Sequence, residues 1–106
     1  MSWVMLLTVT PLGKETSISP YIARAVDIID RSGLDYRLTA MGTIIEADTW
    51  DELARVVGAC LEDLQRDCER ISVVMKIDYR HGPKGRLQGM VRSVVEKLGR
   101  PVPGAT

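Results

Sequence analysis

The chain has 106 residues, of which 45% are hydrophobic and 26% are charged, a composition typical of a folded protein rather than a disordered or fibrous one. Its 14 basic and 14 acidic residues give a net charge of zero, which argues against nucleic acid and membrane surfaces as partners. No apolar run approaches the roughly 20 residues of a membrane span, and the N-terminus lacks the pattern of a signal peptide. We therefore expect a cytoplasmic protein with a single domain over residues 1–106.

The first predicted elements are a strand and a helix. Residues 3–10 are rich in Val, Leu and Thr, which favours a strand. After a loop over residues 12–17, Ser19 is predicted to cap a helix whose first position is Pro20. Gly33 is predicted to end this helix, because glycine readily adopts the left-handed conformation found after a helix C-terminus.

Two short strands come next and predict a hairpin. Residues 34–39 alternate between apolar and polar side chains, as a half-buried strand does. Met41 and Gly42 mark a turn, and residues 43–47 form the returning strand.

A second helix, a long strand and a third helix complete the chain. Thr49 and Glu52 have the spacing of a capping box, and an apolar stripe follows them at helical intervals. Residues 71–80 alternate clearly and predict a strand, while residues 87–98 carry the apolar stripe of a last helix. The tail over residues 99–106 is expected to be flexible.

This order of elements, βαββαβ followed by a helix, predicts an α+β fold of the ferredoxin-like type. The expected core is a four-stranded antiparallel sheet with the two main helices on one face. Lys76, Asp78 and Arg80 would then point to the other face, together with Val4 and Leu6 of the first strand. An apolar sheet face with a charged rim favours self-association, so we expect a homodimer or homotetramer built through the sheet.

Polar residues at the start of the first helix form one candidate site. Ser17 and Ser19 lie where free backbone N–H groups and hydroxyls could hold a polar or anionic group of a ligand. The alternative is that these side chains only cap the helix.

Glu46 and the charges of the last strand form two further candidates. Glu46 lies in a strand dominated by isoleucine, where a carboxylate is disfavoured. It is predicted either to form a salt bridge with Lys76 or Arg80, or to hold a ligand with a positive charge or an N–H group. Lys76, Asp78 and Arg80 are predicted either to form an ion ladder at an interface or to contribute donors and acceptors to a binding site.

Catalytic and metal-binding patterns are absent from the sequence. The two cysteines do not form a CxxC pair, and the single histidine, His81, lies in a Gly-Pro loop, so we expect no metal site and no resident cofactor. Cys60 is predicted to be a core residue, and Cys68 an exposed thiol near a helix end. A disulfide between them is not expected in a reducing cytosol.

Two segments of the chain resemble the family of small thiamine-binding-like proteins. They are SISPYIARAVDIIDRSGLDYRLTAMGTIIEA, over residues 17–47, and MKIDYRHGPKGRLQGMVRSV, over residues 75–94. The resemblance covers about residues 3–98, and its most specific parts are the serines before the first helix, the Met-Gly-Thr turn and the Lys-Ile-Asp strand. It implies a ferredoxin-like fold, sheet-mediated dimers and tetramers, and binding of thiamine or a related pyrimidine with no established enzymatic activity.

The resemblance also implies a set of ligand-binding residues. Thiamine combines a cationic thiazolium with an aminopyrimidine, so a carboxylate could balance its charge or bind its ring edge, and a tyrosine ring could stack on it. Carried over to this sequence, the ligand-binding residues would be Ser17, Ser19, Thr43, Glu46, Lys76 and Asp78, with Tyr21 or Tyr36 as the stacking residue.

Three hypotheses for the function follow. The first is a non-enzymatic binding protein for thiamine or a related pyrimidine, assembled through its sheet. The second is a small enzyme in which Glu46 performs acid–base chemistry with Lys76 or His81. The third is a structural module whose polar strand residues only set the register of an oligomer.

Overall fold

The computed structural model describes residues 1–14 and 17–105. Within the predicted loop, Glu15 and Thr16 lie outside the described residues, and so does Thr106 of the predicted tail. The elements in chain order are β1 (Ser2–Pro11), α1 (Ser19–Arg31), β2 (Asp35–Thr39), β3 (Gly42–Ala47), α2 (Trp50–Leu64), β4 (Ile71–Arg80) and α3 (Arg86–Leu98).

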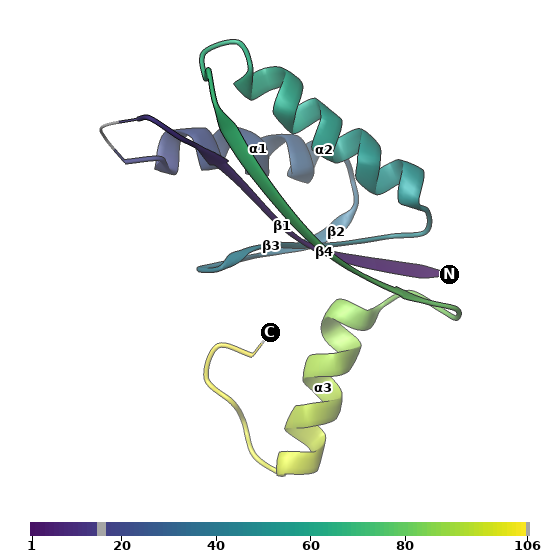
Figure 1. The fold of residues 1–106 in the computed structure, drawn as a ribbon. Coiled ribbons are helices and arrows are strands. Elements are labelled where there is room, and N and C mark those ends of the chain that lie inside the picture. The colour runs from purple at the N-terminus through teal and green to yellow at the C-terminus, as the bar shows by residue number, and fades with distance from the viewer. Residues whose placement is uncertain (15–16, 106) are drawn as a thin grey trace.

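The four strands form one antiparallel sheet in the order β2-β3-β1-β4. This order and the βαββαβ succession confirm the predicted α+β fold of the ferredoxin-like type. Helices α1 and α2 cover one face, while α3 lies on the opposite side of the sheet (Figure 1). We call that opposite side, formed by the even-numbered residues of β1, β3 and β4, the second face. No helix within the described ranges is long and apolar enough to cross a membrane.

The core lies between the sheet and the two helices that share its first face. The odd-numbered residues Met5, Leu7 and Val9 of β1 are almost completely buried there, because alternate residues of a strand point to the same side. Cys60 lies in this core, as predicted. The prediction of an exposed thiol at Cys68 is wrong: this side chain is also buried, and both cysteines are free.

The helix starts follow two different patterns. In α2 the capping box is confirmed, because the Thr49 hydroxyl accepts the Glu52 N–H at 3.2 Å. In α1 the predicted cap is off by one residue: Ile18 is the N-cap, and Ser19 already belongs to the helix. The hydroxyl of Ser17 accepts the Ser19 N–H at 3.2 Å. A serine just before the helix therefore provides a partner for one of the free backbone N–H groups of its first turn.

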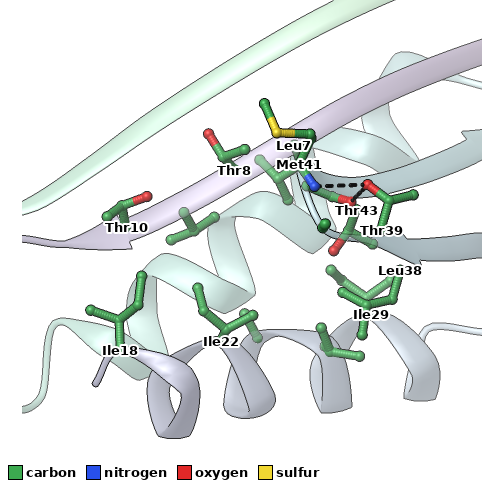
Figure 2. Close-up of a pocket in the computed structure, with 15 residues that line it drawn as sticks. Leu7, Thr8, Thr10, Ile18, Ile22, Ile29, Leu38, Thr39, Met41 and Thr43 are labelled. Carbon is green, nitrogen blue, oxygen red and sulfur yellow. Dashed lines mark hydrogen bonds between the residues drawn. The ribbon is translucent and has the colours of Figure 1, made fainter. Parts of the chain in front are cut away.

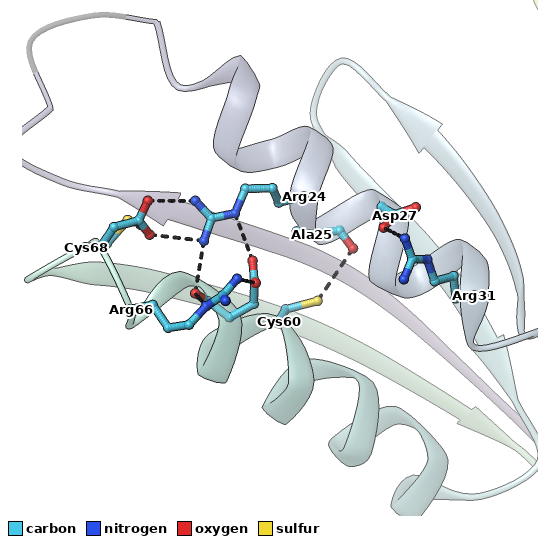
Figure 3. A network of polar contacts seen from close by, with 9 residues as sticks. Arg24, Ala25, Asp27, Arg31, Cys60, Arg66 and Cys68 are labelled. Atoms are coloured by element: carbon cyan, nitrogen blue, oxygen red, sulfur yellow. Dashed lines mark hydrogen bonds and ion pairs between the residues drawn. The ribbon is translucent and has the colours of Figure 1, made fainter.

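Arg24 connects α1 to the end of α2 through paired hydrogen bonds (Figure 3). Its Nε lies 2.9 Å from the Asp63 carboxylate, and its Nη1 and Nη2 lie 2.7 and 3.0 Å from the two carboxylate oxygens of Asp67. These bonds raise the pKa of Arg24 and lower the pKa of both carboxyl groups, because each charged form is stabilised by its partner. These paired hydrogen bonds of the Arg24 guanidinium fix how the two helices lie against each other.

Candidate functional site

A cavity of about 210 Å³ lies where α1 faces the β2–β3 hairpin (Figure 2). Apolar side chains of the sheet and of α1 form most of its wall, among them Leu7, Val9, Ile22 and Ile29. Thr43 lies on the same wall and is 6% exposed. None of the described residues that line it has an ionisable side chain. Such a wall favours a flat, uncharged ring that needs one or two hydrogen bonds for orientation.

The tight hairpin turn closes one end of this cavity. The Thr39 hydroxyl accepts the Met41 N–H at 3.1 Å and donates to the Gly42 carbonyl at 2.7 Å, which holds the turn together (Figure 2). Gly42 has φ +146°, and a Cβ at this position would lie 2.9 Å from the Leu7 carbonyl oxygen. Only glycine lets the turn approach β1 this closely, so the sequence of the turn determines the shape of the cavity.

The candidate residues are divided among the cavity, the groove beside it and the second face of the sheet. The helix start contributes Ile18 and Ile22 to the cavity, and the Met-Gly-Thr turn contributes Thr43. Ser19 lies in a neighbouring open groove, which also contains Asp27 and Asp30. Ser17 is exposed and its hydroxyl donates to that of Ser19 at 3.1 Å.

The two tyrosines considered for stacking have partners of their own. The ring of Tyr21 has the Lys14 ammonium 5.2 Å and the Arg24 guanidinium 5.7 Å from its centroid, so cations already lie close to this ring. Tyr36 donates its hydroxyl to Asp30 at 2.9 Å, and this bond raises the pKa of the phenol. Of the two, Tyr36 lies in the groove beside the cavity.

Glu46 lies on the second face and is 2% exposed. Its Oε1 accepts the backbone N–H groups of Gly85 at 3.0 Å and Arg86 at 3.1 Å, and its Oε2 accepts the hydroxyl of Ser2. The predicted salt bridge to Lys76 or Arg80 is wrong, because no ion pair among the described residues joins Glu46 to either side chain. Instead, this carboxylate binds the free donors at the start of α3, where negative charge is favoured.

The remaining strand charges also lie on the second face. Asp78 accepts Arg86 Nη1 at 2.5 Å, and Arg86 also donates to the Ser2 hydroxyl at 2.8 Å. Lys76 lies on β4, the strand at the edge of the sheet, and its side chain is exposed. Glu46, Lys76 and Asp78 are therefore separated by the sheet from the cavity that contains Thr43.

Several cavity residues cannot be distinguished from core positions by their spacing in the sequence. Ile22 and Ile29 have the spacing of a buried helix stripe, and that spacing is the same whether the facing space is filled or empty. The signal that could have located the cavity is the Met41–Gly42–Thr43 turn, where a glycine is required by close approach to β1. In the portion of the chain that the structure covers, no group of three or more His, Cys, Asp or Glu residues could hold a metal ion.

Comparison with known proteins gives consistent matches over nearly the whole chain. A family model described as thiamine-binding protein matches residues 5–95. The chain is 35% identical to a UPF0045 protein of Mycobacterium bovis over 101 residues, covering 95% of this chain and 99% of the relative. It is 40% identical to a UPF0045 protein of Methanothermobacter thermautotrophicus over 94 residues, covering 87% and 95%.

Solved structures show the same fold. A hypothetical protein from Methanocaldococcus jannaschii superposes with a TM-score of 0.79 at 26% identity, covering 90% of this chain and 97% of that one. A Thermotoga maritima protein with a suggested role in thiamine biosynthesis or salvage superposes with a TM-score of 0.74 at 20% identity, covering 92% and 99%. At that identity, the second likeness concerns the fold alone.

Proposed function

Because the chain belongs to the thiamine-binding protein family, we propose that it binds thiamine or a related pyrimidine without catalysing a reaction. The observation that carries this proposal is the cavity of about 210 Å³ beside the hairpin, with its apolar wall and the side chain of Thr43. The aminopyrimidine is flat and uncharged, which matches a wall whose described residues carry no ionisable group. Its ring nitrogens and amino group can form hydrogen bonds with a hydroxyl such as that of Thr43. The cavity is thus the proposed place for the pyrimidine ring.

A whole thiamine molecule also needs a place for its positive charge. The groove next to the cavity shares Ile22, Val26 and Leu38 with it and contains the carboxylates of Asp27 and Asp30. In our proposal the thiazolium of a bound thiamine lies toward this groove, where the Asp30 carboxylate favours a cation. The Asp27 carboxylate is already paired with Arg31 at 2.8 Å. Glu46 takes no part, because its oxygens are already bound to the start of α3.

The non-enzymatic part of the proposal draws support from the same contacts. A general base must reach the proton it removes, whereas Glu46 is buried and both of its oxygens accept donors from Ser2, Gly85 and Arg86. His81 is exposed in the loop before α3 and is not among the residues that line the cavity. These placements favour binding over acid–base catalysis.

Self-association through the second face is the remaining part of the proposal. Val74 on β4 is 60% exposed, and Met90 and Val94 on α3 are 69% and 55% exposed. Exposed apolar side chains on both a sheet face and a helix favour contact with another copy of the chain. We propose a homodimer or homotetramer in which copies cover this surface.

Calorimetry tests the binding proposal directly. Thiamine and hydroxymethylpyrimidine are each titrated into the purified protein up to millimolar concentration, and we expect saturable heat for both ligands. Thr43→Val keeps the side-chain volume but removes the hydroxyl, and should weaken binding about fivefold, the effect of one hydrogen bond. Ser93→Ala on α3 is the control and should bind as the unmodified chain does. Absence of heat with both ligands would refute the proposed binding of thiamine and its pyrimidine.

A further inference from the structure

A second hollow, of about 290 Å³, lies at the opposite end of β1 from the cavity, beside the start of α2. Its wall includes Trp3, Trp50 and Tyr79. The chain has two tryptophans, three tyrosines and no phenylalanine, so three of its five aromatic side chains gather here. This concentration is notable in a chain otherwise poor in aromatic residues.

The aromatic rings are tilted and partly exposed. The centroid of Trp3 lies 4.7 Å from that of Tyr79 with an interplanar angle of 55°, and 6.3 Å from that of Trp50 with an angle of 44°. Trp50 is 38% exposed and Tyr79 45% exposed, while Trp3 packs against the core. Core packing therefore accounts for Trp3, but it leaves the exposed parts of the other two rings without a function.

Carboxylates line the same hollow. Asp48 and Asp51 belong to its wall. Asp48 forms an ion pair with Lys84 at 3.1 Å, whereas no ion pair between described residues involves Asp51. Glu52, one position further, is already bound to the Asp48 N–H and the Thr49 hydroxyl. Asp51 is therefore the carboxylate that remains free to balance a charge in this hollow.

Aromatic faces next to a free carboxylate are the chemistry that recognises an organic cation. The electron-rich face of an indole or phenol attracts a weakly hydrated positive charge, and alkyl groups on that charge gain apolar contact with the ring. We propose that the hollow formed by Trp3, Trp50, Tyr79 and Asp51 is a binding site for a small organic cation of the quaternary ammonium type. This site is separate from the cavity proposed for the pyrimidine ring.

The intrinsic fluorescence of the protein provides a direct test, because both tryptophans of the chain belong to the proposed site. Choline is titrated into the full chain, and its neutral isostere 3,3-dimethylbutan-1-ol is titrated in parallel. We expect a saturable change in tryptophan emission with choline, and binding of the neutral alcohol that is weaker by about tenfold or more. Equal binding of the two compounds, or no change with choline, would overturn the proposal.

Variants locate the binding within the molecule. Tyr79→Leu keeps both fluorophores and should weaken choline binding by about tenfold, and Asp51→Asn by about threefold. Glu62→Gln, on the exposed side of α2, should leave choline binding unchanged. Lys84→Met should strengthen binding, because it removes a competing cation beside Asp48. If Tyr79→Leu does not fold, as judged by circular dichroism, Trp50→Leu followed by the emission of Trp3 replaces it. Unchanged choline affinity in either folded aromatic variant would contradict the assignment.

The two sites can be separated experimentally. Thr43→Val should leave choline binding unchanged, and Tyr79→Leu should leave the heat of hydroxymethylpyrimidine binding unchanged. If hydroxymethylpyrimidine fails to bind while choline binds as expected, the proposed function fails and the cation site stands. The reverse result rejects the cation site alone.

Discussion

Glu46 is a buried carboxylate whose partners are hydrogen-bond donors of the chain itself. Its two oxygens accept from Gly85, Arg86 and Ser2, so removing the negative charge leaves these donors with a poorer partner. We expect Glu46→Gln to lower the free energy of unfolding by about 1–3 kcal/mol and to speed amide hydrogen exchange at the start of α3. Urea unfolding and hydrogen exchange measure these effects.

Glu62 on the exposed side of α2 provides the matched control for this prediction. Glu62→Gln should change the stability by less than about 0.5 kcal/mol. If Glu46→Gln leaves both stability and exchange unchanged while abolishing a reaction of the protein, the acid–base hypothesis for Glu46 would be preferred.

Cys60 is a thiol whose ionisation is suppressed by burial, which raises its pKa to about 11. Between an ordinary thiol pKa of about 8.5 and this value, the unfolded chain loses the proton and the folded chain keeps it. The contribution of this thiol to stability is therefore complete below about pH 8.5 and is lost as the pH rises through 11. As the pH rises from 8 to 10, the urea midpoint of Cys60→Ala should fall less steeply than that of the unmodified chain. Equal slopes of midpoint against pH in the two proteins would refute this account.

At the level of the elements, the hairpin depends on Gly42. A Cβ here would approach the Leu7 carbonyl oxygen to 2.9 Å, and the backbone has φ +146°. We expect Gly42→Ala to cost about 2–4 kcal/mol of stability and to abolish pyrimidine binding, because the turn must move away from β1. Gly58→Ala in α2 is the control: nothing lies within 4 Å of its added Cβ, so it should stabilise by about 0.5–1 kcal/mol. Equal stability of the two variants, by urea unfolding, would contradict the strain assigned to Gly42.

The contact between α1 and α2 depends on the paired geometry of Arg24. Arg24→Lys retains the charge, but a lysine cannot bind both carboxylates at once as the planar guanidinium does. We therefore expect Arg24→Lys to lower the urea midpoint. The control is Arg31→Lys, which should lower it less because its partner Asp27 is exposed. The lowered pKa of Asp63 and Asp67 adds a pH dependence. Their contribution is present above the ordinary carboxyl pKa and is lost as the pH falls through the lowered values, so the two variants should become more alike in acid. A constant difference from pH 7 to pH 2 would refute this.

How far the sequence predicted these elements depends on the range of the interaction. The alternation in β4 and the Thr49–Glu52 capping box are local patterns, and both were located correctly. The partner of Glu46 could not be predicted, because the donors of Gly85 and Arg86 reach it only after the loop that follows β4 brings the start of α3 to the second face. The cavity beside Thr43 was missed for a related reason: an apolar residue beside empty space has the same spacing as one in a filled core.

For the whole molecule, the exposed apolar residues of α3 and the second face lead to the last prediction. If copies of the chain cover this surface, the double variant Met90→Glu and Val94→Glu should dissociate, because charges buried at an interface without partners are strongly unfavourable. Light scattering after size exclusion should then show a dimer or tetramer for the unmodified chain and a monomer for this variant. Ala59→Glu, on the exposed side of α2, is the control and should retain the oligomer. A monomeric unmodified chain at high micromolar concentration would contradict the assembly, while the calorimetric test of pyrimidine binding would still stand on its own.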